Sequence, residues 1–170
     1  MSKIFGAITQ CGYVVPDLDG AMDYWANSLG IGPWFEIDTS VFEDMVHRGE
    51  PTPMRVRIAL ANSGDLQIEL IQPLDTLPSP YNDFLQASGG KAGLQHVSSW
   101  PERAVFDRLI SERPVLFSGR GGGTRFAYFD GAYDLGAMME IADLSRGTRA
   151  FFDDIKQAAQ SWDGKQTLAS

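Results

Sequence analysis

The order of predicted secondary-structure elements occurs twice along the chain, and this repetition limits the possible folds more than any other feature. Residues 7–15 are rich in Ile, Val and Tyr and precede Pro16, which predicts a strand. A helix follows behind Asp17, a good N-cap, with apolar residues at helical spacing. Three further strands are predicted, over residues 34–37, 55–61 and 66–72. The polar stretch 40–53 is predicted to be an irregular loop.

The second half of the chain gives the same β-α-β-β-β order. A strand is predicted over 94–100, and Pro101 then starts a helix that reaches about Glu112. The remaining strands are predicted over residues 115–117, 125–129 and 137–141. The glycine-rich segment 119–123 is predicted to be a hairpin turn, because no helix or Lys-Ser/Thr pair follows it to form a phosphate loop. The repeat predicts two modules, residues 6–73 and 93–143, with equivalent positions.

A separate segment follows the repeat. Residues 1–145 are expected to form the two-module domain, and residues 146–170 a C-terminal helix and tail. Phe151, Ile155, Ala158 and Trp162 lie at helical spacing behind Thr148 and predict an apolar stripe. We expect this helix to pack against the outside of the repeat or against a partner subunit.

Polar residues stand at matching places in the two halves. Gln10 in the first strand of one half corresponds to His96 in the first strand of the other. Glu69 and Glu140 correspond in the last strands. Taken singly, a mid-strand His is usually a hydrogen-bonded core residue, and a mid-strand Glu is usually the exposed half of an alternating strand. Because an unpaired carboxylate is costly to bury, two of them at matching positions suggest a shared cation.

Composition narrows the function class. The chain has 170 residues and a net charge of −8, which argues against general affinity for nucleic acid. It has no run long enough to predict a membrane span, and its N-terminus does not resemble an export signal. The single cysteine, Cys11, is expected to be a packing residue. We therefore expect a cytoplasmic protein that acts on a small molecule.

Five segments carry a family resemblance: GYVVPDL at 12–18, LGIGPW at 29–34, QIELIQP at 67–73, GLQHV at 93–97 and MEI at 139–141. The chain resembles the vicinal oxygen chelate superfamily, which contains glyoxalase I, methylmalonyl-CoA epimerase, extradiol dioxygenases and bleomycin-resistance proteins. The resemblance covers about residues 6–143. It implies an α+β fold in which two βαβββ modules form a cupped sheet around a divalent metal, and it implies a homodimer.

The resemblance also implies the site residues. The metal ligands would be Gln10, Glu69, His96 and Glu140, with Zn, Ni, Mn, Mg or Co as the ion. Glu140 would transfer the proton of the carbon next to the carbonyl, and Glu69 could act on the opposite face of that carbon. The commonest bacterial pattern has His at the position of Gln10. Eukaryotic-type glyoxalase I has Gln there, as this sequence does. Extradiol dioxygenases use two His and one carboxylate, so this difference argues against ring cleavage.

The resemblance and the residues together leave two classes of function open. One is a metal-dependent isomerase or lyase that acts on carbon next to a carbonyl. The other is a metal-free binding or resistance-type protein that uses the same cup without chemistry. Apolar residues on or beside the cup strands could form its walls and bind a partly apolar substrate: Trp34, Phe35, Met54, Trp100, Phe126 and Tyr128. His47 is expected to be solvated within the polar loop.

Overall fold

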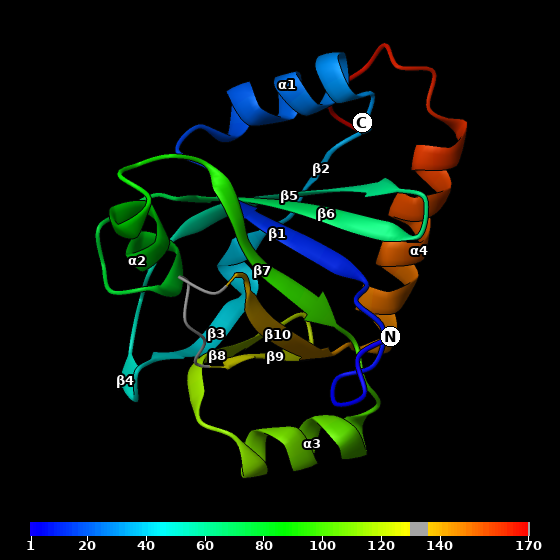
Figure 1. Ribbon diagram of the computed structural model, residues 1–170. Coiled ribbons are helices and arrows are strands. Elements are labelled where there is room, and N and C mark those ends of the chain that lie inside the picture. Colours follow the sequence, from blue (N-terminus) through cyan, green and yellow to red (C-terminus); the bar gives the residue numbers. More distant parts are fainter. Residues whose placement is uncertain (130–135, 170) are drawn as a thin grey trace.

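A strongly curled sheet organises the molecule (Figure 1). The computed structural model describes residues 1–129 and 136–169. Within these residues, ten strands form one sheet in the order β2-β5-β6-β1-β7-β10-β9-β8-β3-β4. Helix α1 (Leu18–Leu29) covers one end of the curled sheet from outside, and α3 (Arg103–Glu112) covers the other. The predicted α+β class, the cupped sheet and the C-terminal helix are confirmed.

The element order repeats in space as it does in the sequence. The first half contributes β1 (Gln10–Val14), β2 (Phe35–Glu36), β5 (Val56–Ser63) and β6 (Leu66–Pro73). The second contributes β7 (Gly93–Ser99), β8 (Val115–Gly121), β9 (Thr124–Phe129) and β10 (Met138–Asp143). In each half the first strand pairs in parallel with the last, β1 with β6 and β7 with β10.

The two halves join through an antiparallel pairing of β1 with β7. Gln10 lies opposite Ser98, and Gly12 lies opposite His96. Glu69 pairs with Gly12 in one half, and Glu140 pairs with Ser98 in the other. The register therefore places Gln10 and His96 at equivalent positions, and likewise Glu69 and Glu140.

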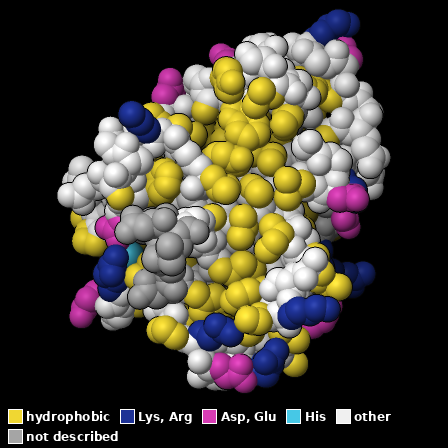
Figure 2. Space-filling model, in the orientation of Figure 1, with side chains coloured by type: hydrophobic (Ala, Val, Ile, Leu, Met, Phe, Trp, Pro, Cys, Tyr) yellow, Lys and Arg dark blue, Asp and Glu magenta, His cyan; other side chains and the backbone are white. Residues whose placement is uncertain are grey.

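Strand alternation separates an inner core from an outer one. On β5, Val56, Ile58 and Leu60 face the inside of the cup, whereas Ala59 and Ala61 pack beneath α1. The Asp17 side chain accepts a hydrogen bond from Gly20 N at the start of α1, and Gly30 ends the helix at φ +68°. Over β1 and β7, a band of apolar side chains fills the outer surface between α1 and α3 (Figure 2).

The expected loop at 40–53 was wrong, because the segment contains a short 3₁₀ turn (Thr39–Val41) and the strands β3 (Phe42–His47) and β4 (Glu50–Pro51). Strand β3 extends the sheet of the second half by pairing with β8. Its register shifts between Glu43 and Val46, and Asp44 has φ +51°, so the sequence lacks simple strand alternation. His47 is consequently 4% exposed instead of solvated, and its Nε2 lies 3.2 Å from Asp83 Oδ2 on α2 (Pro80–Ala87).

Helix α4 (Arg146–Ser161) lies against the inner side of the cup, so the expectation that it packs outside was wrong. Ile155 is fully buried in the inner core, and Phe152 packs against that core. The apolar stripe predicted the helix correctly, but it could not specify which surface the stripe would meet. None of the helices in the described ranges has the length and apolarity needed to span a membrane.

Candidate active site

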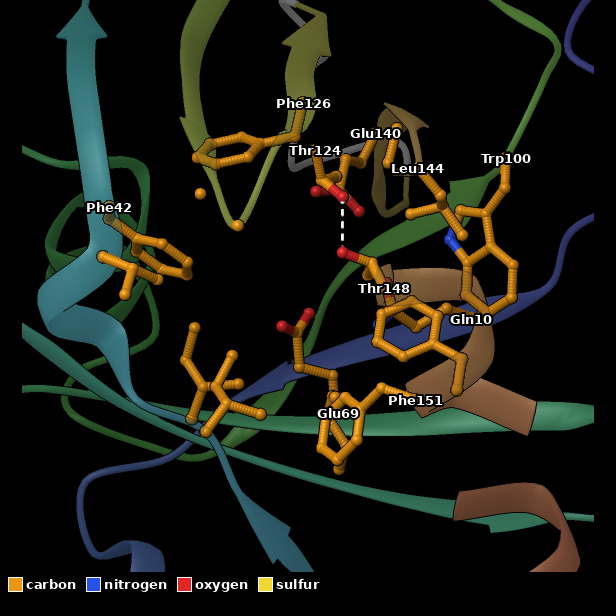
Figure 3. Close-up of a pocket in the computed structure, with 18 of the residues that line it drawn as sticks. Gln10, Phe42, Glu69, Trp100, Thr124, Phe126, Glu140, Leu144, Thr148 and Phe151 are labelled. Atoms are coloured by element: carbon orange, nitrogen blue, oxygen red, sulfur yellow. Dashed lines mark hydrogen bonds between the residues drawn. The ribbon is translucent and has the colours of Figure 1, made fainter. Parts of the chain in front are cut away.

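The cup contains a partly open cavity of about 230 Å³ between the two halves of the sheet. Both halves line it, together with the 3₁₀ turn, β3 and α4. Its walls are mainly apolar, and Glu69 and Glu140 supply polar atoms within them (Figure 3). The site is therefore a small apolar chamber with carboxylates inside it.

Glu69 and Glu140 enter this cavity from opposite halves of the molecule (Figure 3). Both are largely buried, with 9% and 8% of their surface exposed. Each sits near the middle of the last strand of its half, β6 or β10. Strand alternation turns both side chains inward, while Ile68 and Ile141, one position away, join the outer cores.

His96 is fully buried beside the two carboxylates and does not itself line the cavity. Its Nε2 lies 3.2 Å from Glu69 Oε2 and 3.6 Å from Glu140 Oε2. Nδ1 donates to Gln95 Oε1 at 2.6 Å, since an amide oxygen can only accept. In the neutral ring, Nε2 then presents its lone pair toward the carboxylates. Although Nε2 lies within ion-pair distance of both carboxylates, it has no correctly directed hydrogen-bond partner among the residues that the structure describes.

A glycine on the neighbouring strand makes room for this histidine. Gly12 lies directly opposite His96, and a Cβ atom built on Gly12 would overlap the imidazole ring. The ring therefore packs flat against the backbone of β1. The Tyr128 ring also contacts the imidazole in an edge-on arrangement, with the ring centroids 4.9 Å apart. These contacts fix the direction of Nε2.

Burial and neighbouring charges shift the acid–base properties of the cluster. Burial raises the pKa of Glu140 to about 7; His96 opposes this increase and the Glu69 carboxylate adds to it. Burial lowers the pKa of His96, but the Glu69 and Glu140 carboxylates outweigh it, so the net shift is upward. Burial also raises the pKa of Tyr128 well above its usual value, and the Tyr128 hydroxyl lies 3.1 Å from the Tyr81 hydroxyl.

The four predicted ligands do not stand in equivalent surroundings. Gln10 lines the cavity, but its Nε2 donates to Gln67 Oε1 at 2.8 Å. As they stand, the side chains form an ion-pair cluster, and no group of three His, Cys, Asp or Glu in the described ranges is arranged as a metal site. The types of donor nevertheless suit a divalent ion, because an imidazole nitrogen with no hydrogen-bond partner faces two buried carboxylates.

The predicted wall residues divide into two groups. Trp100, Phe126 and Tyr128 line the cavity. Trp34 is fully buried in the outer core under α1, and Met54 is buried in the inner core. Phe35 is half-buried and contacts Phe151, with the ring centroids 6.1 Å apart.

Sequence reasoning missed several cavity residues. Phe42 comes from the segment taken for a loop, and Phe151 and Phe152 come from the helix expected to pack outside. Thr124 and Thr148 line the cavity too, and their hydroxyls share a hydrogen bond of 2.7 Å (Figure 3). Only the apolar stripe of the last helix hinted that any of these residues face the interior.

Comparison with known proteins agrees with this geometry. Residues 9–110 match the family model described as the glyoxalase/bleomycin resistance protein/dioxygenase superfamily. The chain belongs to this superfamily. Its resemblance to this superfamily, first seen in the sequence motifs, is thereby confirmed. A search of curated protein sequences found no match.

Solved structures show the same superfamily fold. Methylmalonyl-CoA epimerase from Mycobacterium tuberculosis matches with a TM-score of 0.61 and 22% identity, over 88% of this chain and 95% of that one. A Streptomyces coelicolor methylmalonyl-CoA epimerase variant in complex with 2-nitronate-propionyl-CoA matches with a TM-score of 0.55 and 18% identity, over 79% and 92% of the two chains. At these identities the likeness establishes the fold.

Proposed function

We propose that the protein is a metal-dependent isomerase that moves a proton at the carbon next to a substrate carbonyl. The observation that carries this proposal is the pair of buried carboxylates, Glu69 and Glu140, which enter one cavity from opposite halves beside His96. An isomerase that removes a proton from one face and returns it on the other needs an acid–base group at each face. The site offers two.

Glu140 is the proposed proton-transferring group. It is held inside an apolar cavity, so its carboxylate is poorly solvated and basic. Glu69 faces it across the cavity and would hold or return the proton on the opposite side. Both carboxylates are largely buried among apolar walls, and this poor solvation strengthens the electrostatic interactions between them and their neighbours.

Gln10, Glu69, His96 and Glu140 are the residues proposed to hold a divalent ion. Such an ion, when bound, would polarise the substrate carbonyl and favour loss of the neighbouring proton. His96 is a positioned ligand, since Gln95 fixes its tautomer and Gly12 fixes its plane. The Gln10 amide would bind the ion through Oε1, while its Nε2 keeps the hydrogen bond to Gln67.

Exchange of a carbon-bound proton tests the proposal. Candidate 2-oxo, 2-hydroxy-ketone and thioester compounds are incubated with protein and divalent ions in D₂O, and deuterium incorporation is followed by NMR. We expect exchange with at least one compound, strict dependence on an added divalent ion, and its loss in Glu140→Gln.

Failure to detect exchange with any candidate, together with no metal found by elemental analysis after reconstitution, would contradict the proposal. The cavity would then belong to a protein that binds a small molecule without chemistry. Exchange that persists in Glu140→Gln but disappears in Glu69→Gln would reverse the two roles.

A further inference from the structure

We infer that the cavity selects an uncharged carbonyl compound with one compact apolar group, such as an aryl ketone, and that helix α4 sets this limit. The inference rests on the proposed function, because it names the substrate class of the same site. It excludes substrates attached to a large anionic carrier such as coenzyme A.

The position of α4 is the first argument. Ser145 begins the helix, and its hydroxyl donates to the carbonyl oxygen of Gly122 at 2.9 Å. The Thr124–Thr148 hydrogen bond lies one turn further along. Further on still, Ile155 is fully buried in the inner core. The helix is therefore tied to the β8–β9 turn and to the core, and it forms one wall of the cavity.

The aromatic side chains of this wall determine its size limit. Phe152 lies 5.0 Å from Trp100 between ring centroids, and Phe151 contacts Phe35. Phe42 and Phe126 form the facing wall, with their centroids 5.9 Å apart. The cavity volume of about 230 Å³ lies below the roughly 300–1,000 Å³ of pockets for drug-sized ligands. A single ring or a short branched chain is the largest apolar group that suits it.

Charge supplies the second, independent argument. Among the described residues that line the cavity, every charged side chain is acidic: Asp38, Glu69 and Glu140. One divalent ion would balance the two glutamates and leave the charge of Asp38 in excess. Because no Lys, Arg or His among the described residues lines the cavity to pair with a carboxylate or phosphate, an anionic substrate would meet repulsion. A neutral ketone avoids that cost.

Calorimetric titration of the protein with Mn²⁺ present compares three probes: 2-hydroxyacetophenone, benzoylformate and methylmalonyl-CoA. 2-Hydroxyacetophenone and benzoylformate share an aryl ketone and differ in charge. Methylmalonyl-CoA carries the large anionic coenzyme A group. We expect the neutral ketone to bind at least about tenfold more tightly than benzoylformate, because like charges disfavour the anion. Methylmalonyl-CoA should give no measurable binding.

Two variants connect this selectivity to the named residues. Phe152→Ala should admit a naphthyl analogue of the ketone and raise its affinity by about tenfold or more, since a few carbon atoms in an apolar pocket carry that much discrimination. Phe152→Leu is the milder variant if the first fails to fold. Gln157→Ala, on the exposed side of α4, is the matched control and should change nothing. Asp38→Asn keeps a residue able to cap the 3₁₀ turn and should strengthen benzoylformate binding severalfold.

The outcomes separate this inference from the proposed function. Tight binding of methylmalonyl-CoA, or binding of none of the three probes, overturns the inference. Exchange catalysed on a coenzyme A thioester would overturn the inference and leave the isomerase proposal standing. Selective binding of the neutral ketone with size control by Phe152, but without proton exchange on any compound, would support the inference and contradict the isomerase.

Discussion

The two halves of the sheet have the same element order and yet offer different chemistry at their matching positions. Glu69 has Gly12 beside it on the neighbouring strand, and Glu140 has Ser98. On the other side, Glu69 pairs with Leu60, whereas Glu140 pairs with Tyr128. The nearby hydroxyls of Ser98 and Tyr128 lower the pKa of Glu140 and so partly offset the increase that burial causes. The repeat thus supplies symmetric positions, and the neighbours of each position supply distinct roles.

The same contrast applies to the first strands. His96 occupies space that exists only because Gly12 lacks a side chain. Gln10, its counterpart, lies opposite Ser98 and forms a hydrogen bond with Gln67 within its own half. One half therefore presents a fixed imidazole nitrogen, and the other presents an amide whose nitrogen is already hydrogen-bonded to Gln67. We therefore expect His96 to contribute more to metal affinity than Gln10 does.

The largest effect is expected when His96 is removed. His96→Ala should abolish proton exchange by weakening metal binding, and excess metal should partly restore activity. Metal content after dialysis and activity against metal concentration measure this effect. Gln10→Ala is the counterpart in the other half and should weaken metal binding less. Equal losses of metal binding in His96→Ala and Gln10→Ala would contradict the proposed difference between the two halves.

Substitution of the two carboxylates compares the last strands. Glu140→Gln keeps the shape and an oxygen donor but removes the base, so exchange should slow by about 10²–10⁴-fold. Glu69→Gln should slow exchange less. Initial rates of deuterium incorporation at saturating metal give the comparison, and the opposite ranking would assign proton transfer to Glu69.

Gly12 and Ser98 form a matched pair for a stability test. Gly12→Ala should push His96 out of place and destabilise the protein by about 1–3 kcal/mol, as overpacking does in other cores. Ser98→Ala, at the equivalent position, removes one oxygen and should have a smaller effect. Urea denaturation measures both. Little change in Gly12→Ala would show that the imidazole has room to move.

The last prediction concerns the pH dependence of the metal-free protein. The pKa of Glu140 is raised from 4.5 to about 7, so folding favours its protonated form. The resulting stabilisation is complete below pH 4.5 and is lost as the pH rises through about 7. His96, whose pKa is also raised, acts in the same direction. The free energy of unfolding in EDTA should therefore fall between pH 5 and 8.

Glu140→Gln supplies the control for this pH test. One proton contributes at most about 1.4 kcal/mol per pH unit, so the variant should show a shallower slope by no more than that. Glu69→Gln should remove part of the slope, since the Glu69 charge adds to the shift of Glu140. Identical slopes in the wild-type protein and Glu140→Gln would contradict the assigned shift.

The sequence by itself determined the repeat, the fold class and the equivalence of Gln10 with His96 and of Glu69 with Glu140. Strand alternation and helical spacing are local properties, and the same local pattern in both halves leads to the same arrangement. The helix over 146–161 was also predictable, because its apolar stripe is local.

Only the tertiary structure decided where the non-local partners meet. Residues 42–47 lack regular alternation and become a strand because the edge of β8 offers unpaired backbone groups. Trp34 and Phe126 are both aromatic residues on or beside strands, yet one lies under α1 and the other in the cavity. The stripe of α4 gives no sign of which apolar surface it will cover. Contacts between distant segments depend on shape and packing across the whole molecule, and these are absent from any local pattern.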